Sequence, residues 1–189
     1  MQDINTEIYN AFEVIKNGGI ILYPTDTVWG IGCDASNPEA VAKIYALKQR
    51  EESKSMIVLM NAEKMMYNVF KDIPEVAWQI LDLSEKPTTL ILDNPRNVAA
   101  NLIASDKTLG VRIVKEPFCF KLLERMKKPL VSTSANISGK PTPNTFKEIS
   151  QEILKGVDYV VNLQNEKMTG KPSAIIKLTN DSQVKIIRK

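Results

Sequence analysis

The sequence predicts a single α/β domain with a twisted, mixed parallel and antiparallel sheet flanked by helices. Short apolar runs rich in β-branched residues alternate with segments whose apolar residues recur at helical spacing. The last three apolar runs, from Tyr159 onward, follow one another without clear helices between them, which favours partly antiparallel pairing. The 189 residues suffice for one core and contain no repeat or linker, so we expect one domain over residues 1–189.

Local signals set the elements of the first half. Gly18 and Gly19 end the first helix, and Pro24 ends the first strand. Asn37 and Pro38 are typical of a helix cap and a first turn. The predicted elements are a helix over residues 4–15, a strand over 20–23, a loop over 24–36, a helix over 38–50, a strand over 56–60, and helices over 62–70 and 74–84.

The second half follows the same alternation until it ends in strands. The runs "LGVRIV" and "PLVST" are typical of buried strands, and a helical pattern separates them. The predicted elements are strands over residues 88–92 and 109–114, a helix over 117–126, a strand over 129–133, a helix over 146–154, and strands over 159–162, 174–178 and 184–187.

The composition excludes several kinds of chemistry. The chain has no histidine, so Ser-His-Asp or Cys-His catalysis and His-ligated zinc are excluded. The sequence contains no run of 18 uncharged apolar residues, so a membrane span is not expected. The acidic N-terminus does not resemble a signal peptide. We therefore expect a cytoplasmic protein. The net charge of +3 is modest for a nucleic-acid binder, and the basic segment at residues 121–128 is expected to be a solvated helix face.

Polar loops follow several predicted strands. In open α/β sheets, ligands bind beyond the carboxyl ends of strands. Three such loops are "PTDTVWG" after the strand at 20–23, "STSANISG" after the strand that begins at Pro129, and the loop at 105–108 that leads into Arg112. Each loop alone is also consistent with an ordinary turn or a helix cap. Their occurrence together in one small domain favours a ligand site.

The cations in this sequence suit an anionic ligand. Lys48, Arg50 and Lys54 come just after a predicted helix, where the helix dipole also favours cations for purely structural reasons. Arg112 lies inside an apolar strand and must either face solvent or meet an anion, because burying it unpaired is costly. Arginine suits the bidentate capture of a carboxylate or phosphate.

Two nucleotide motifs are weak or absent. "GIGCDA" at residues 30–35 formally fits the dinucleotide pattern, but six residues separate it from the preceding strand, so a nicotinamide cofactor is a minor alternative. Gly139-Lys140 and Gly170-Lys171 are each followed by proline rather than Ser or Thr, so no Walker A motif is present. A bound triphosphate would depend on separate cationic side chains and hydroxyls.

Four segments together resemble the YrdC/Sua5 family of L-threonylcarbamoyladenylate synthases. They are "GGIILYPTDTVWGIGCDA", "KQREESKSMIVL", "LGVRI" and "PLVSTSANISGKPTP". The resemblance runs from about Gly18 to the end and is closest to the short, single-domain form. It implies the conversion of L-threonine, bicarbonate or CO2 and ATP to threonylcarbamoyl-AMP and pyrophosphate, with Mg2+ accompanying ATP. It also implies a role in the synthesis of N6-threonylcarbamoyladenosine on tRNA, with hand-over to the tRNA threonylcarbamoyltransferase complex.

The resemblance assigns ligands residue by residue. The places matching the family's threonine ligands are Thr27, Arg112, Ser134 and Ser173, with Arg112 expected to take the carboxylate. The places matching its nucleotide ligands are Lys48, Arg50, Lys54, Thr108, Asn136, Asn144 and Arg188. Thr133 and Ser138 are expected to be turn and cap residues. No covalent catalytic residue and no protein-held metal is implied, because the substrate supplies the nucleophile.

Several positions depart from the family pattern. Leu59 stands where many members have histidine, Trp29 replaces a commoner tyrosine, and Lys54 stands where some members have asparagine. No glycine follows Arg188, which makes its match the least complete. The alternatives left open are a relative that acts on another carbamoyl adenylate and one that mainly binds RNA. Weak binding of tRNA or other RNA is also compatible with the main hypothesis.

Overall fold

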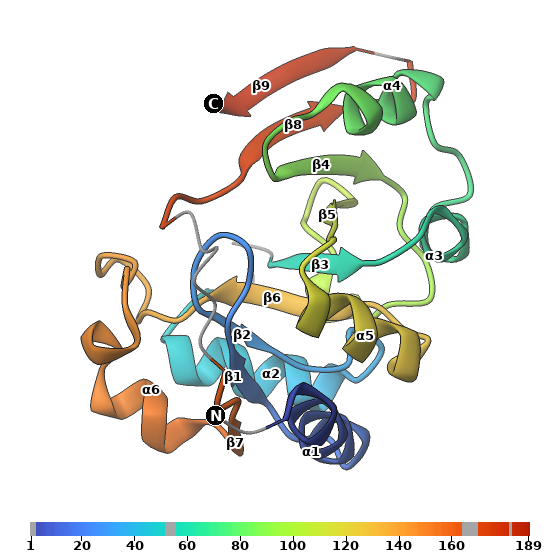
Figure 1. Cartoon of the computed structure of the whole chain (residues 1–189). Coiled ribbons are helices and arrows are strands. Elements are labelled where there is room, and N and C mark those ends of the chain that lie inside the picture. Colours follow the sequence, from blue (N-terminus) through green and yellow to red (C-terminus); the bar gives the residue numbers. More distant parts are fainter. Residues whose placement is uncertain (1–2, 52–55, 164–169, 182) are drawn as a thin grey trace.

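One mixed sheet connects the elements of the chain. The computed structural model describes residues 3–51, 56–163, 170–181 and 183–189 (Figure 1). Across these residues the strand order is β7-β1-β2-β6-β3-β5-β4-β8-β9. The strands are β1 (Ile21–Tyr23), β2 (Gly30–Gly32), β3 (Ile57–Met60), β4 (Thr88–Asp93), β5 (Thr108–Ile113), β6 (Leu130–Ser134), β7 (Tyr159–Val160), β8 (Ala174–Leu178) and β9 (Val184–Arg188).

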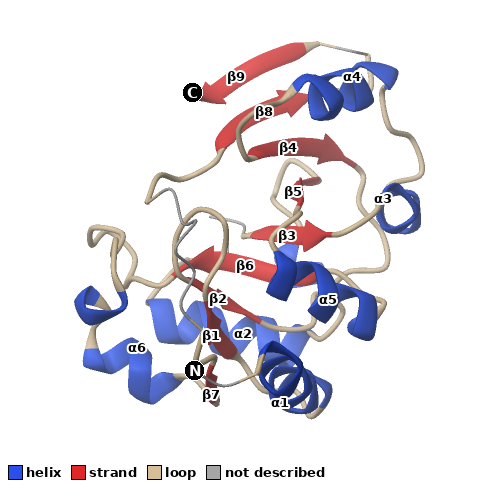
Figure 2. Cartoon of the chain, viewed as in Figure 1, coloured by secondary structure: helices blue, strands red, loops and turns tan. Residues whose placement is uncertain are grey.

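Helices flank this sheet, as Figure 2 shows. The helices are α1 (Ile4–Lys16), α2 (Pro38–Lys48), α3 (Glu63–Val69), α4 (Glu75–Leu83), α5 (Pro117–Met126) and α6 (Gln151–Gly156), with short 3-10 turns at Ala100–Leu102 and Phe146–Glu148. None of the described helices is long and apolar enough to span a bilayer.

Two apolar clusters form the core, one on each face of the sheet. Adjacent residues of a strand point to opposite faces, so Val58 belongs to one cluster and Leu59 to the other. The first cluster includes apolar side chains of α2, α3 and α4, and the second includes those of α1 and α5. The predicted mixed α/β fold is therefore confirmed.

The helix cap predicted at Asn37 is present. Asn37 Oδ1 accepts hydrogen bonds from the amides of Glu39 and Ala40 at the start of α2. Glu116 caps α5 in the same way, by accepting from the amides of Phe118 and Cys119. These bonds satisfy N–H groups that have no partner within the helix.

Two predictions of local structure were wrong. Residues 24–36 were expected to form a loop, but Gly30–Gly32 form β2, which pairs with β1 on one side and β6 on the other. Glycine has a low β propensity, so the strand signal is missing from the sequence. The helix expected over residues 146–154 is interrupted: Ser150 caps the separate helix α6, because its hydroxyl accepts a hydrogen bond from the Ile153 amide.

The dinucleotide alternative is also wrong. Gly30 and Gly32 lie inside the antiparallel strand β2 rather than at a turn between a strand and a helix. A β-carbon on Gly32 would lie 2.4 Å from the Val131 carbonyl oxygen. This glycine therefore allows the close approach of β6, and no phosphate-binding turn forms here.

Candidate active site

The loop after β1 is a compact hydroxyl turn. Thr25 Oγ1 accepts hydrogen bonds from the amides of Thr27 (3.0 Å) and Val28 (3.2 Å) and donates to the Val28 carbonyl (2.7 Å). Thr25 and Thr27 are both buried. Threonine commonly bonds to nearby backbone groups in this way. The result is a fixed turn that presents Asp26 and Thr27 to β5.

Arg112 of β5 meets this turn. Its side chain is 3% exposed, Nη1 donates to Thr27 Oγ1 at 3.1 Å, and Nη2 forms an ion pair with Asp26 at 3.0 Å. Among the described residues, Nε has no hydrogen-bond partner although it is buried. A buried polar group without a partner is costly and often marks a ligand position. Arg112 therefore retains capacity for an anion.

A cavity of about 270 Å³ opens over this arginine. Six of the predicted ligands line it: Thr27, Arg50, Arg112, Ser134, Ser173 and Arg188. They come from segments far apart in the sequence, brought together by the central strands of the sheet. The structure therefore places most of the predicted threonine and nucleotide ligands around one cavity.

Sequence reasoning missed other polar residues of this cavity. Thr25, Ser132, Thr133 and Thr142 also line it, and Gly30 forms part of its wall. Thr133 was expected to be only a turn residue. The alternation of β6 could have indicated Ser132, because it points to the same face of the strand as Ser134.

The cavity is cationic, and its arginines influence one another. Burial lowers the pKa of Arg50, and burial followed by the nearby charge of Arg112 lowers the pKa of Arg188. Both shifts show that these charges are partly removed from water and disfavoured. An anionic ligand would relieve this cost by pairing with them.

Ser173 and Arg188 form the opposite wall. The hydroxyls of Ser173 and Thr89 lie 2.8 Å apart, and Arg188 Nε donates to the Ser173 carbonyl at 2.8 Å. These contacts hold the start of β8 against β4 and direct β9 toward the cavity. Arg188 was the least complete match to the family pattern, yet it lines the same cavity as Arg50 and Arg112.

Four predicted nucleotide ligands do not line this cavity, and a fifth lies outside the described residues. Thr108 lies four residues before Arg112, on the same face of β5, and its hydroxyl donates a hydrogen bond to Asp106. Asn136 is bonded within its own loop through the carbonyl of Lys140 at 2.6 Å. Asn144 is exposed, with its amide donating to Glu148. The remaining two are Lys48, whose ammonium contacts backbone carbonyls, and Lys54, which lies outside the described residues.

The two family departures described here are core residues. Leu59 is fully buried in the cluster under α1 and α5. Trp29 is 7% exposed and packs against Phe146, with ring centroids 5.1 Å apart. Neither lines the 270 Å³ cavity. Trp29 was left open as core or ligand wall, and the structure favours the core.

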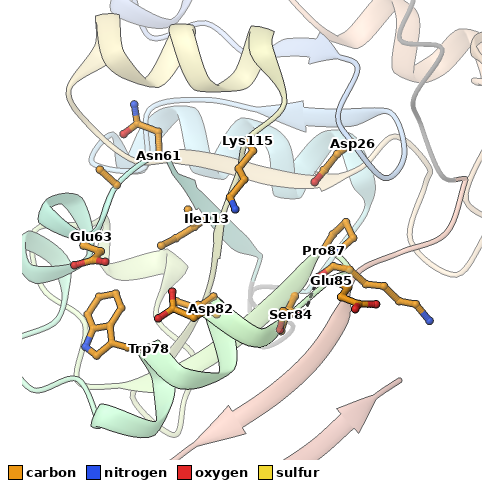
Figure 3. Close-up of a pocket in the computed structure, with 14 residues that line it drawn as sticks. Asp26, Asn61, Glu63, Trp78, Asp82, Ser84, Glu85, Pro87, Ile113 and Lys115 are labelled. Carbon is orange, nitrogen blue, oxygen red and sulfur yellow. Dashed lines mark hydrogen bonds between the residues drawn. The ribbon is translucent and has the colours of Figure 1, made fainter.

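A larger cavity, of about 500 Å³, lies near the first: Asp26, the ion-pair partner of Arg112, is in its lining. Ile113 lines this cavity, whereas its neighbour Arg112 lines the smaller one. Figure 3 shows Trp78 and Asp82 of α4 and Lys115 around this space. Its rim includes Asp26, Glu63, Asp82 and Glu85, so it is poorly suited to a triphosphate. The smaller, cationic cavity is the candidate active site.

Comparisons with known proteins identify the family of this chain. The family model described as "Telomere recombination", which covers the Sua5, YciO and YrdC proteins, matches residues 13–189. The chain belongs to this family. A provisionally named threonylcarbamoyl-AMP synthase of Methanocaldococcus jannaschii is 38% identical, over 91% of this chain and 80% of that protein. The threonylcarbamoyl-AMP synthase of Acinetobacter baumannii is 30% identical, over 83% of this chain and 87% of that protein.

Solved structures of family members share the fold. E. coli YciO superposes with a TM-score of 0.84 at 25% identity, over 100% of this chain and 91% of that one. P. abyssi Sua5 complexed with L-threonine superposes with a TM-score of 0.85 at 25% identity, over 94% of this chain. This chain spans about half of that Sua5, 52% of its length. The YrdC-like fold expected from the motifs is thus confirmed.

Proposed function

We propose that this family member is an L-threonylcarbamoyladenylate synthase, a nucleotidyltransferase that joins L-threonine, bicarbonate or CO2 and AMP from ATP. The observation that carries this function is Arg112, buried beside hydroxyl groups with its Nε unpartnered, in a cavity also lined by Arg50 and Arg188. Curated relatives with this activity in their names support the same conclusion.

The threonine ligands are proposed from the contacts around Arg112. The guanidinium takes the carboxylate of threonine, because arginine binds such groups through paired hydrogen bonds. Ser134 Oγ donates to Asn136 Oδ1 at 2.5 Å, so its remaining capacity is that of an acceptor, suited to an N–H or O–H group of threonine. Thr27 and Ser173 complete the proposed threonine site.

The nucleotide occupies the arginine side of the cavity in this proposal. Arg50 and Arg188, which line the cavity, neutralise phosphate charge. The other proposed nucleotide ligands do not line the cavity, and the nucleotide would contact them only where it extends beyond it. They are Lys54, Thr108, Asn136 and Asn144. The reaction needs no protein nucleophile. The threonine amine adds CO2 and loses a proton, a carbamate oxygen bonds to the α-phosphorus, and the bond to the leaving pyrophosphate breaks. Catalysis is then positioning and charge stabilisation.

Mg2+ is proposed to arrive with ATP. No carboxylate is among the described residues that line the cationic cavity, and Asp26 beside it is paired with Arg112. Mg2+ in phosphate-transfer sites is bound mainly by substrate phosphates, water and few protein groups. The hydroxyl-rich wall fits such a metal–phosphate complex, in which the ion shields the pyrophosphate charge.

The partners follow from the product. Threonylcarbamoyl-AMP is an activated acyl donor, so we propose its hand-over to the tRNA threonylcarbamoyltransferase complex. Weak RNA contact is a further proposal, although the cations of the basic segment 121–128 are partly engaged: Arg125 stacks over Tyr9 and Phe12, and Lys128 pairs with Asp34. The two cysteines are free and buried, which fits the cytoplasmic location that we propose.

Threonine-dependent release of pyrophosphate tests this function. Purified protein with ATP, Mg2+, bicarbonate and L-threonine is expected to release pyrophosphate and form threonylcarbamoyl-AMP, detected by mass spectrometry. Omitting threonine is expected to abolish both signals. Pyrophosphate release that is independent of threonine, or no release at all, would overturn the proposal.

The same assay separates the alternative function. HypF in its phosphate- and nucleotide-bound form shares this fold with a TM-score of 0.80 at 25% identity, over 28% of its own chain. This likeness supports a nucleotide site in this fold, and a related reaction on another carbamoyl adenylate is the second candidate. Pyrophosphate release with another carbamoyl donor but without threonine would support it. Tight RNA binding that weakens steeply with salt, without any turnover, would instead support an RNA-binding role.

A further inference from the structure

Lys48 and Arg50 are only two residues apart but have different environments. Arg50 lines the cationic cavity, whereas the Lys48 side chain is 1% exposed and does not line it. Gln49 between them adopts a left-handed conformation, with φ of 49°, at the C-terminal end of α2. Because this residue turns the chain, the two side chains leave the helix in different directions.

The ammonium of Lys48 contacts the loop that follows β6. Nζ donates to the backbone carbonyls of Ser134 and Asn136, the latter at 2.5 Å. The Lys48 carbonyl also accepts a hydrogen bond from the Ser138 amide at 2.8 Å. Hydrogen bonds from a charged donor are stronger than neutral ones. Lys48 therefore joins α2 to this loop at three points.

Apart from Lys48, the loop between Ser134 and Lys140 is held by its own polar groups and by the Ala135 amide, which donates to the Trp29 carbonyl at 2.9 Å. Ser134 Oγ bonds to Asn136 Oδ1, and Asn136 Nδ2 donates to the carbonyls of Ile137 and Lys140. The side-chain bonds fix the loop internally, and the Ala135 amide joins its start to the segment before β2. The Lys48 contacts join the loop to α2, and one of them is to Ser134, which lines the cationic cavity.

We propose that Lys48 is a positioning residue that sets the orientation of Ser134 and the following turn, rather than a ligand of the nucleotide phosphates. The substrate is reached through Ser134, not through the ammonium itself. This inference rests on the proposed function for the identity of the substrate, but its main test uses the protein without any substrate.

Hydrogen exchange of residues 132–140 in the substrate-free protein is the main test. Lys48→Met keeps the length of the side chain but removes the donor and the charge. Its exchange in this segment is expected to be about tenfold faster than in wild type, while Lys48→Gln, which keeps an N–H donor without the charge, lies between them. Lys43→Met is the matched control, since Lys43 lies on the same helix and donates to the distant Gly18 carbonyl.

If Lys48 were instead a ligand of the ATP phosphates, it would have no role before ATP binds. That hypothesis therefore predicts a different exchange result. Unchanged exchange in Lys48→Met, together with an increase in the KM for ATP alone, would overturn the proposal. Loss of protection throughout the chain would also overturn it, because Lys48 would then act on global stability rather than on this loop. Exchange in Lys43→Met and Arg50→Met is expected to match wild type within this segment.

A double-variant comparison tests whether Lys48 acts through Ser134. Lys48→Met and Ser134→Ala are each expected to raise the KM for threonine about tenfold. The KM for threonine of the double variant is expected to exceed that of the more impaired single variant by no more than about twofold. The reason is that the effects of residues sharing one interaction do not add. Losses that multiply to about a hundredfold would contradict positioning through Ser134. If wild type shows no threonine-dependent turnover, the proposed function fails, while the exchange result still decides the role of Lys48.

Discussion

At the scale of single residues, Arg112 is both buried in the core and held by polar partners from the turn after β1. It is one of few charged residues in the core, and the hydroxyl turn of Thr27 and the carboxylate of Asp26 occupy its two terminal nitrogens. Because an arginine fixed in this way loses little further freedom on binding, it is well suited to select a carboxylate in one orientation.

Replacing Arg112 by alanine is expected to weaken threonine binding more than ATP binding. Loss of a charged hydrogen-bonding partner should raise the KM for threonine by roughly ten- to a hundredfold, with a smaller change in the KM for ATP. Steady-state pyrophosphate assays measure both constants. Arg96→Ala is the control, because Arg96 is exposed and its guanidinium donates to the Tyr67 carbonyl, outside the cationic cavity. A larger effect on ATP would show that the two ligand roles are exchanged.

Lys48 is also expected to affect the dependence of stability on pH. Burial, and to a lesser extent the charge of Arg50, lowers its pKa to about 7. In the unfolded chain this amine keeps its proton to about pH 10, so between these values the unfolded state binds more protons. The contribution of Lys48 to stability should therefore increase as pH rises from about 7 to about 10, and be fully lost once the pH has fallen below about 7.

Urea unfolding at pH 6.5 and pH 9 measures this effect. The free energy of unfolding of wild type, minus that of Lys48→Met, is expected to rise by roughly 1–2 kcal/mol between these pH values. The two carbonyl contacts favour the ammonium and keep the change below its maximum. The same difference taken with Lys43→Met should be flat. A flat difference for Lys48→Met would show that its amine stays protonated in the folded protein.

At the scale of elements, β2 shows how packing alone can define a strand. Its residues are Gly30, Ile31 and Gly32, and pairing on both sides with β1 and β6 holds them in the sheet. The two glycines serve different purposes. Gly32 allows close contact with β6, whereas Gly30 lies in the wall of the cationic cavity.

Alanine at these two positions is expected to have separate effects. In Gly32→Ala the new methyl group would meet the Val131 carbonyl at 2.4 Å, so the free energy of unfolding should fall by about 2–3 kcal/mol. In Gly30→Ala the nearest atoms are at 3.3 Å, so stability should change by less than about 1 kcal/mol while the KM for substrate rises. Denaturant unfolding and the pyrophosphate assay distinguish them. Equal stability losses would contradict this division of roles.

At the scale of the whole molecule, the sheet order explains the site. Strand β6 lies between β2 and β3, and β5 lies on the other side of β3. This order brings the turn after β1, the end of β6 and Arg112 of β5 to one region, with β8 and β9 completing it. A single mixed sheet (Figure 1) thus brings separate polar segments together around one cationic cavity.

Much of this arrangement could be predicted from the sequence. Periodicity and caps gave most helices and strands, because apolar spacing and the Asn37 cap are local signals. The absence of histidine excluded several mechanisms, and the paired hydroxyl motifs identified the family. β2 and the break before α6 were missed, because strand pairing and the position of Ser150 depend on contacts with distant residues.

The sequence by itself determined the element pattern, the family and the types of chemical group available: hydroxyls, amides and arginines. Only the tertiary structure decided which of these groups line the cationic cavity. Lys48 and Arg50 belong to one short basic motif, yet the left-handed turn at Gln49 directs the first to the carbonyls of the β6 loop and the second to the cavity. The direction of a side chain depends on such backbone turns and on the distant groups that the side chain contacts. Composition and residue spacing specify neither the turns nor those contacts.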